Sequence, residues 1–248
     1  MNNMKLGIQL YTVRETLRQD FKGTLRELAK LGYDGVELIP QFGGMEPGEL
    51  AAFLKGIGLQ ACGFHAGFKD FSDPSTNLFD YAHAVGTPYI SSSCCGDYTK
   101  IWRECVKNCR IVGHIAARHN LQFTYHNHHQ EFVLVDGIVA QDRIYASTDP
   151  EEVKFELDVY WIKKRGADPV EYIRRFTGRL PQIHLKDMAA DDGSFTELGC
   201  GVIDLPGCIA AAREGDCRWL IYEQDACRRD PLESAAISIN CLKTLVGR

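Results

Sequence analysis

Short apolar runs with strand character recur along this chain, and stretches with helical periodicity lie between them. Eight such runs occupy residues 6–10, 35–39, 59–64, 87–92, 121–126, 153–158, 180–186 and 218–223. No hairpin signal joins neighbouring runs, and the first run lacks the glycine-rich turn usual in a doubly wound sheet. The alternation is therefore typical of a closed parallel (β/α)8 barrel, an α/β TIM barrel.

The expected helices carry recurring boundary signals. Helical periodicity covers residues 24–32, 47–58, 97–120, 168–179, 205–215 and 231–245. Four of these segments have a proline near the start, at Pro47, Pro169, Pro206 and Pro231. Proline is favoured there because the first helical N–H groups have no partner within the helix. Gly32 ends the first segment and predicts a glycine C-cap.

Composition limits the class of protein. The 248 residues contain no linker or low-complexity segment, so we expect a single domain over residues 1–248. None of the ten cysteines lies in a CxxC pair, which predicts reduced thiols. The start lacks a signal-peptide pattern and no long apolar span follows, so we expect a cytoplasmic protein without membrane partners. A net charge of −5 argues against nucleic-acid binding.

Polar side chains follow nearly every apolar run. In a parallel barrel the active site forms at the carboxyl ends of the strands, so these residues are expected to meet in space. They are Gln9 with Tyr11, Glu37, His65, residues 91–93, residues 126–128, Asp158, His184 with Lys186, and Glu223. A lone polar residue at a strand end usually caps a loop. Repetition in the second half of the chain predicts a shared site instead.

Four of these residues form a set suited to a metal ion. Two imidazoles and two carboxylates make a mixed nitrogen and oxygen set that favours Mn²⁺, Co²⁺, Zn²⁺ or Fe²⁺ over Mg²⁺. Four protein ligands would leave positions open for two substrate oxygens on such an ion. The four residues are His126, Asp158, His184 and Glu223.

The same segments resemble a known family. The stretches ELDVYW, HLKD and YEQD, with GIQLYTVRE, LAKLGYDGVEL, GLQACGFHAGF and YHNHHQEF before or between them, resemble the sugar phosphate isomerase/epimerase family of xylose isomerase-like TIM barrels. The resemblance covers essentially the whole chain. It implies a divalent metal ion held at the positions of His126, Asp158, His184 and Glu223.

One position departs from the family pattern. Epimerases of this family usually have a glutamate where this chain has His126. There, two glutamates bind the metal and exchange protons on the two faces of the sugar. A histidine that binds metal through one nitrogen cannot act as that base, because its lone pair is occupied. Glu223 remains as the expected base, and its partner must come from another residue.

Two further residues are expected to be catalytic. His128 lies two residues beyond His126, so both side chains point to one side of an extended backbone. It either reaches the substrate or caps the loop. Lys186 would donate a proton or hold an enolate oxygen, unless it pairs with Asp187 or Glu156.

The remaining strand-end residues are candidates for substrate binding. Glu37 would bind a sugar hydroxyl or act as a second acid or base, unless it forms a salt bridge at the rim. His65 would face the substrate or be a buried, hydrogen-bonded imidazole. Trp161 would stack on a sugar or pack between helices. Gln9 and Tyr11 complete the candidates.

These observations favour a divalent-metal-dependent isomerase or epimerase that removes a proton next to the carbonyl of a keto sugar. The alternative is a metal-dependent lyase or dehydratase acting on a keto-cyclitol or a 3-keto-glycoside, because elimination needs only one base and one acid. A multi-zinc DNA endonuclease would require a basic face, and an inactive sugar-binding barrel would bind without exchanging deuterium. Barrels of the resembled family often pair, so a homodimer is one expectation.

Overall fold

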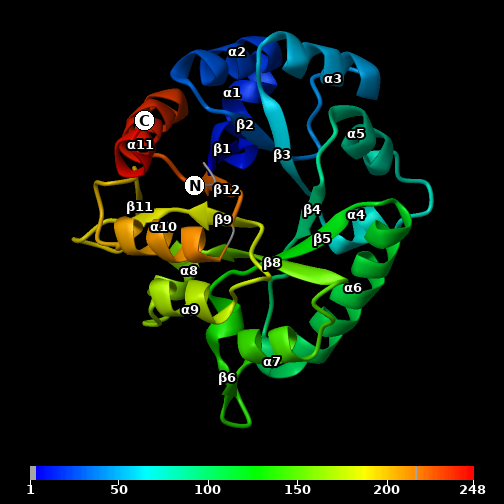
Figure 1. Ribbon diagram of the computed structural model, residues 1–248, viewed down its shortest axis with the longest axis vertical. Helices are drawn as coiled ribbons and strands as arrows, with labels where there is room; N and C mark the ends of the chain where they lie inside the picture. Colours follow the sequence, from blue (N-terminus) through cyan, green and yellow to red (C-terminus); the bar gives the residue numbers. More distant parts are fainter. Residues whose placement is uncertain (1–3, 216) are drawn as a thin grey trace.

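The computed structural model describes residues 4–215 and 217–248 and shows a closed barrel of parallel strands. Helices surround the barrel on the outside (Figure 1). Around the barrel the strand order is β1-β12-β9-β8-β5-β4-β3-β2. The strands are β1 (Lys5–Gln9), β2 (Gly35–Leu38), β3 (Gln60–His65), β4 (Tyr89–Ser92), β5 (Gln122–His126), β8 (Val153–Asp158), β9 (Gln182–Leu185) and β12 (Trp219–Tyr222). The predicted α/β barrel is confirmed.

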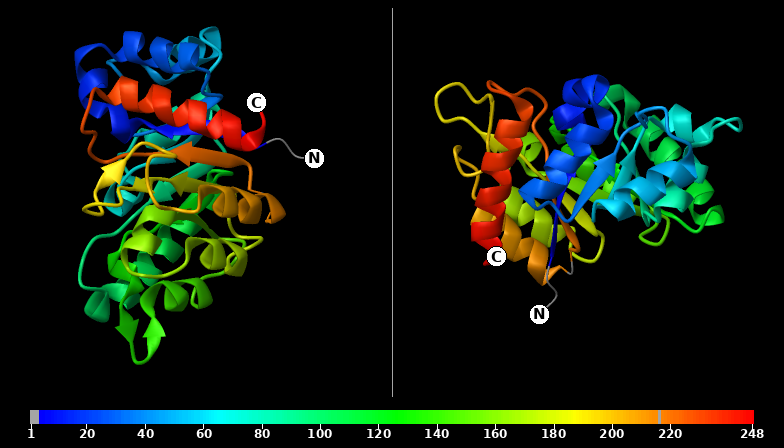
Figure 2. Two further views of the ribbon diagram at one scale, coloured as in Figure 1. Left: turned by 90° about the vertical axis from the view of Figure 1, so that its left-hand side faces the viewer. Right: turned by 90° about the horizontal axis from the view of Figure 1, so that it is seen from above.

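The helices follow the strands as the alternation predicts. They are α1 (Arg14–Gln19), α2 (Phe21–Leu31), α3 (Pro47–Gly56), α4 (Phe68–Ser72), α5 (Leu78–Val85), α6 (Tyr98–Arg118), α7 (Ala140–Ala146), α8 (Val159–Lys164), α9 (Pro169–Arg175), α10 (Leu205–Glu214) and α11 (Pro231–Val246). Short 3-10 turns lie at η1 (Leu10–Val13) and η2 (Gln130–Phe132). The last helix, α11, packs beside α2 and closes the ring of helices (Figures 1 and 2).

The predicted boundary signals lie where they were expected. Proline occupies the first or second position of α3, α9, α10 and α11. Gly32 ends α2 with φ 93°, a left-handed conformation that favours glycine. Its N–H donates to the carbonyls of the last helical turn, which satisfies groups that the helix itself leaves unpaired.

Neighbouring barrel strands are parallel, and two short hairpins that the sequence did not predict lie in the connections between them. Strands β6 (Leu134–Val135) and β7 (Ile138–Val139) pair antiparallel and project beyond α7 (Figures 1 and 2). Their two-residue turn is Asp136 and Gly137, with φ 47° and 77°, the geometry that Asp-Gly sequences adopt in tight hairpins. The second pair is β10 (Asp187–Met188) and β11 (Phe195–Thr196). Both hairpins are insertions between barrel strands, so the parallel order is unchanged.

The interior of the barrel is apolar at one end and polar at the other. Outward residues such as Phe155, Leu157 and Ile183 pack under the helices and are completely buried. Near the amino ends of the strands, Cys62, Tyr89, Trp219 and Ile221 form a separate apolar cluster. Toward the carboxyl ends, the inward side chains are polar, although they remain buried. The pleat therefore directs the polar residues of each strand to one common site.

Two further expectations concern cysteines and membranes. Every cysteine is a free thiol, as the lack of CxxC pairs predicted. Within residues 4–215 and 217–248, none of the helices combines the length and apolar character needed to cross a membrane.

Candidate metal centre

The four residues expected to hold a metal ion converge at the carboxyl ends of neighbouring strands. His126 ends β5, Asp158 ends β8, His184 lies in β9 opposite Asp158, and Glu223 follows β12. One ligand atom from each lies within 4.8 Å of the others, and all four side chains are buried. Parallel register thus brings together residues that are far apart in the sequence.

One carboxylate oxygen of Asp158 accepts backbone hydrogen bonds, and the other faces the cluster. Its Oδ1 accepts hydrogen bonds from the backbone N–H groups of Tyr160 and Trp161 at 2.9 and 3.1 Å, which caps α8. Its Oδ2 faces the cluster, where the Nε2 atom of His126 lies 3.4 Å away. Burial raises the pKa of Asp158, while Lys186 and His184 act to lower it. The cap therefore fixes the direction of the free oxygen.

His126 has the properties of a metal ligand. Neither ring nitrogen has a hydrogen-bond partner among the described residues, although the side chain is only 3% exposed. Burial lowers the pKa of His126 well below its ordinary value, and the neighbouring His184 and His128 rings lower it further. A neutral imidazole keeps a lone pair for a metal ion. The residues present therefore fit a divalent cation.

His184 is held from both sides of its ring. Its Nδ1 lies 2.8 Å from Oε2 of Glu223, within the cluster. Its Nε2 lies 2.7 Å from Oε2 of Glu37 and 3.2 Å from Oε1 of Glu156, on the interior side. A carboxylate behind a ligating histidine is the arrangement that orients the ring at metal sites. The geometry thus leaves Nδ1 as the nitrogen that faces the centre.

Lys186 lies among the carboxylates rather than beside the partners expected for it. Its Nζ is 3.1 Å from Asp158, 2.9 Å from Glu223 and 2.9 Å from Asp225, and it is 1% exposed. Asp187 and Glu156, the alternative partners named from the sequence, do not pair with it among the described residues. Asp187 instead accepts backbone N–H groups of residues 199, 201 and 203 and holds that loop.

The charges of this cluster depend on one another. Burial would raise the pKa of Glu223, but Lys186 and His184 lower it well below its ordinary value. Burial and the charge of Glu223 raise the pKa of Asp225 to about 6, against the opposing effect of Lys186. Sequence reasoning missed Asp225, although it lies two residues beyond Glu223 and shares its side of the chain.

His128 and Trp161 border the open side of the centre. The His128 ring is 5.1 Å from the His126 ring and 5.5 Å from the Trp161 ring. Burial lowers the pKa of His128 to about 4, and Lys186 contributes to the decrease. Lys186 also lies 5.3 Å from the Trp161 ring. Both side chains are partly exposed, so they remain candidates for contacting a substrate.

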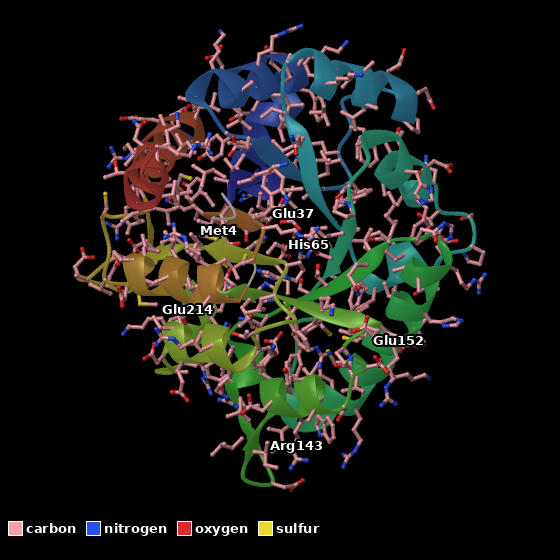
Figure 3. The ribbon with its side chains drawn as sticks, viewed as in Figure 1. Met4, Glu37, His65, Arg143, Glu152 and Glu214 are labelled. Atoms are coloured by element: carbon pink, nitrogen blue, oxygen red, sulfur yellow. The ribbon has the colours of Figure 1, made fainter. Side chains whose placement is uncertain are left out.

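The other candidates for substrate binding lie at different depths. Tyr11 is 42% exposed, whereas Gln9 is buried and donates to Oε2 of Glu37. Glu37 is completely buried. It therefore lies deeper in the barrel than the rim position that the sequence predicted. His65 is partly exposed, and its Nε2 is 3.3 Å from the hydroxyl of Ser93. Figure 3 shows Glu37 and His65 close together near the middle of the barrel.

Glu131 is a buried carboxyl group that sequence reasoning did not single out. Its Oε1 accepts hydrogen bonds from Tyr125 at 2.7 Å and from Tyr98 at 3.1 Å. It therefore anchors the loop that follows His126 to the outer side of β5. The sequence offered little indication of this role, because a single glutamate in a histidine-rich loop is usually exposed to solvent.

Comparisons with known proteins concern the sequence and the fold. The model of the family described as xylose isomerase-like TIM barrel matches residues 25–245. The inosose dehydratase of Geobacillus kaustophilus (strain HTA426) is 26% identical, over 90% of this chain and 86% of that protein. In alignments with several other inosose dehydratases, the chain spans about half the length of the relative.

Solved structures share the fold. A sugar phosphate isomerase/epimerase from Parabacteroides distasonis ATCC 8503 superimposes with a TM-score of 0.82 at 21% identity, over 99% of this chain and 95% of that chain. The IOLI protein, whose crystal structure holds a zinc atom, superimposes with a TM-score of 0.78 at 16% identity, over 98% of both chains.

Proposed function

Because the chain belongs to the family of xylose isomerase-like TIM barrels, we propose that it is a divalent-metal-dependent lyase. Its substrate class would be a keto-cyclitol or a 3-keto-glycoside, from which it eliminates water or another group on the carbon β to the carbonyl. This assignment replaces the isomerase or epimerase that the sequence favoured. The main support for this assignment is His126. By the family resemblance it occupies the position at which an epimerase has its second carboxylate base.

The metal ion would be held by His126, Asp158, His184 and Glu223. A bound divalent cation polarises a substrate carbonyl and so acidifies the neighbouring C–H bond. All four side chains are buried. Mixed imidazole and carboxylate ligands support Mn²⁺, Co²⁺, Zn²⁺ or Fe²⁺.

Glu223 and Lys186 form the acid and base pair of the proposed reaction. The Glu223 carboxylate takes the proton from the carbon next to the carbonyl, and the electrons of that C–H bond form the new double bond. The β C–O bond then breaks, and the leaving oxygen takes a proton from the ammonium group of Lys186. Lys186 Nζ and Glu223 Oε2 are 2.9 Å apart, so the proton can return directly from the acid formed to the amine.

His126 supports elimination over epimerisation for a simple reason. Epimerisation requires proton removal on one face of the carbon and proton return on the other. Around this centre Glu223 is the carboxylate on the side of Lys186 and Asp225. The family resemblance puts His126 at the position of the second glutamate. With its lone pair on the metal, an imidazole cannot take that second proton. The similarity to inosose dehydratases supports the same reaction class.

The test is a reaction in D₂O followed by NMR, with Mn²⁺-loaded protein and either a keto-inositol or a 3-keto-glycoside as substrate. We expect loss of the β-substituent and formation of an unsaturated or dicarbonyl product. Glu223→Gln should abolish the reaction. Glu214→Gln, which changes an exposed carboxylate on α10, should leave it intact. Recovery of a deuterated epimer that still carries its β-substituent would exclude the lyase assignment.

The isomerase or epimerase reading is the second candidate. The observation in its favour is Lys186, whose ammonium group lies beside Glu223 and could return a proton from that same side to the neighbouring carbon, which is isomerisation rather than epimerisation. The same NMR experiment separates the two reactions, because epimerisation introduces deuterium without releasing a leaving group.

A further inference from the structure

A cavity of about 980 Å³ lies at the amino ends of the barrel strands, opposite the candidate metal centre. Its lining includes the first residues of β1, β3, β4 and β12, which are Lys5, Gln60, Tyr89 and Trp219. These strands are four to six residues long, which is roughly 13–20 Å at about 3.3 Å per residue. The cavity is therefore separate from the metal centre at their carboxyl ends.

The floor of the cavity is aromatic. Tyr89 and Trp219 both line it, each is 6% exposed, and both belong to the apolar cluster near the amino ends of the strands. Leu54 of α3 and Leu59 before β3 add buried aliphatic surface. Cavities that bind small molecules are mostly apolar and have volumes of about 300–1,000 Å³, so this cavity has a suitable size and surface.

Small residues on two helices leave this space open. Ala51 on α3 and Ala84 on α5 line the cavity. Gly58 and Gly86, just after these helices, line it as well, with φ 79° and 70°. A Cβ added at either glycine would meet no atom of the described residues within 4 Å. Protein interiors are normally close-packed, so the short side chains explain why a hollow remains here.

The charged residues that line the cavity are all cations. They are Lys5, Lys55 and Arg218, and none of the described lining residues is acidic. None of the three forms a salt bridge within residues 4–215 and 217–248. The charge of Lys5 also acts on Asp34, but that carboxylate forms its salt bridge with Arg248. A cleft that combines charges of one sign with apolar walls attracts ligands of the opposite charge.

Two of the cations are placed beside the apolar surface. Nζ of Lys5 donates to Oε1 of Gln60 at 2.7 Å and lies 5.3 Å from the centre of the Trp219 ring. Its ammonium group is thus held next to the aromatic floor. Lys55 lies four residues after Ala51, so the two share one face of α3. The helix face that leaves the space open therefore also supplies a charge to it.

We propose that this cavity binds a small organic anion, with an apolar ring against the aromatic floor and a phosphate or carboxylate group held by Lys5, Lys55 and Arg218. Lysine and arginine form charge-assisted hydrogen bonds with the oxygens of both groups. The cavity shares no lining residue with the candidate metal centre. The proposal therefore does not rest on the proposed function, and the ligand is distinct from the substrate.

Calorimetric titration of the full-length protein tests both parts of the ligand. Phenyl phosphate carries a ring and a phosphate, and isophthalate carries a ring and two carboxylates, so the pair distinguishes the two kinds of anion. Inorganic phosphate has the charge without the ring, and phenol has the ring without the charge. We expect phenyl phosphate or isophthalate to bind with a Kd below about 10 mM. Inorganic phosphate and phenol should each bind at least about tenfold more weakly. The proposal is wrong if neither ring-bearing anion binds, or if either partial ligand binds as tightly.

Substitutions test whether the anion binds in the cavity. Lys55→Gln and Arg218→Gln should each weaken binding of the ring-bearing anion by at least about tenfold, because each removes a charged donor. Ala51→Phe keeps every charge and should also weaken binding, because the larger side chain fills the cavity. Lys107→Gln changes an exposed lysine on α6, and as the matched control it should leave binding unchanged. Binding that is equally strong in Lys55→Gln, Arg218→Gln and the wild type would lie elsewhere on the molecule and would refute the proposal.

Discussion

Glu131 provides a quantitative test of the structure through the pH dependence of stability. Its carboxyl group is completely buried, and its Oε1 accepts hydrogen bonds from Tyr125 and Tyr98. Burial raises the pKa of Glu131 from 4.5 to about 7, although the Tyr125 hydrogen bond acts in the opposite direction. The carboxyl group is therefore protonated in the folded protein at pH values where it is ionised in the unfolded chain.

The direction of the effect follows from proton binding. Between pH 4.5 and about 7 the folded state holds a proton on Glu131 that the unfolded state has lost. The stability that this proton contributes is fully present below pH 4.5 and is lost as the pH rises through about 7. A difference of about 2.5 pH units corresponds to about 3 kcal/mol, at roughly 1.4 kcal/mol per unit.

The assay is urea unfolding of the wild type and Glu131→Gln at a series of pH values from 4.5 to 8. Glutamine cannot ionise, so the stability of the wild type relative to the variant should fall by about 3 kcal/mol across this range. Glu197→Gln is the matched control. Burial would raise the pKa of Glu197, but hydrogen bonding by Ser234 and the charge of Arg229 lower it below its ordinary value, so the difference between wild type and this variant should be nearly constant from pH 4.5 to 8. A wild-type–Glu131→Gln difference that is flat or rises with pH would refute the reasoning.

Three further changes test the centre and the loop beside it. Removing the divalent metal with a chelator should lower the free energy of unfolding by about 2.7 kcal/mol relative to protein in Mn²⁺ at 100 times its Kd. Thermal unfolding measures this loss, and added Mn²⁺ should reverse it. An unchanged Tm would argue against a bound ion. Lys186→Met should slow elimination by about 10²–10⁴-fold while metal content, measured in parallel, stays at the wild-type level, because the lysine is proposed as acid and not as ligand. Gly201→Ala should destabilise the protein by about 1–3 kcal/mol in urea, because the new Cβ would overlap the carboxylate of Asp187. Gly48→Ala, where the Cβ meets open space, is its control and should not destabilise; equal losses in both variants would contradict the contact.

The order of strands and the positions of their ends could be predicted from the sequence alone. The predicted strand at 153–158 coincides with β8, and the others differ from the observed strands by one to two residues at an end. Apolar runs of strand length followed by helical periodicity leave few other folds possible. In a parallel barrel all carboxyl ends share one face, so His126, Asp158, His184 and Glu223 were expected to meet, and their side chains do.

The partners of these side chains were decided only by the tertiary structure. Lys186 pairs with Asp225 and two cluster carboxylates, and Glu37 lies below the rim against His184. Neither contact follows from sequence spacing, because each joins side chains from different strands across a closed barrel. Register between strands and the direction of the pleat determine which atoms meet at a given depth. Closure of the barrel therefore brought the buried carboxylates of Glu37 and Glu156 to the same nitrogen of His184, which the linear sequence does not encode.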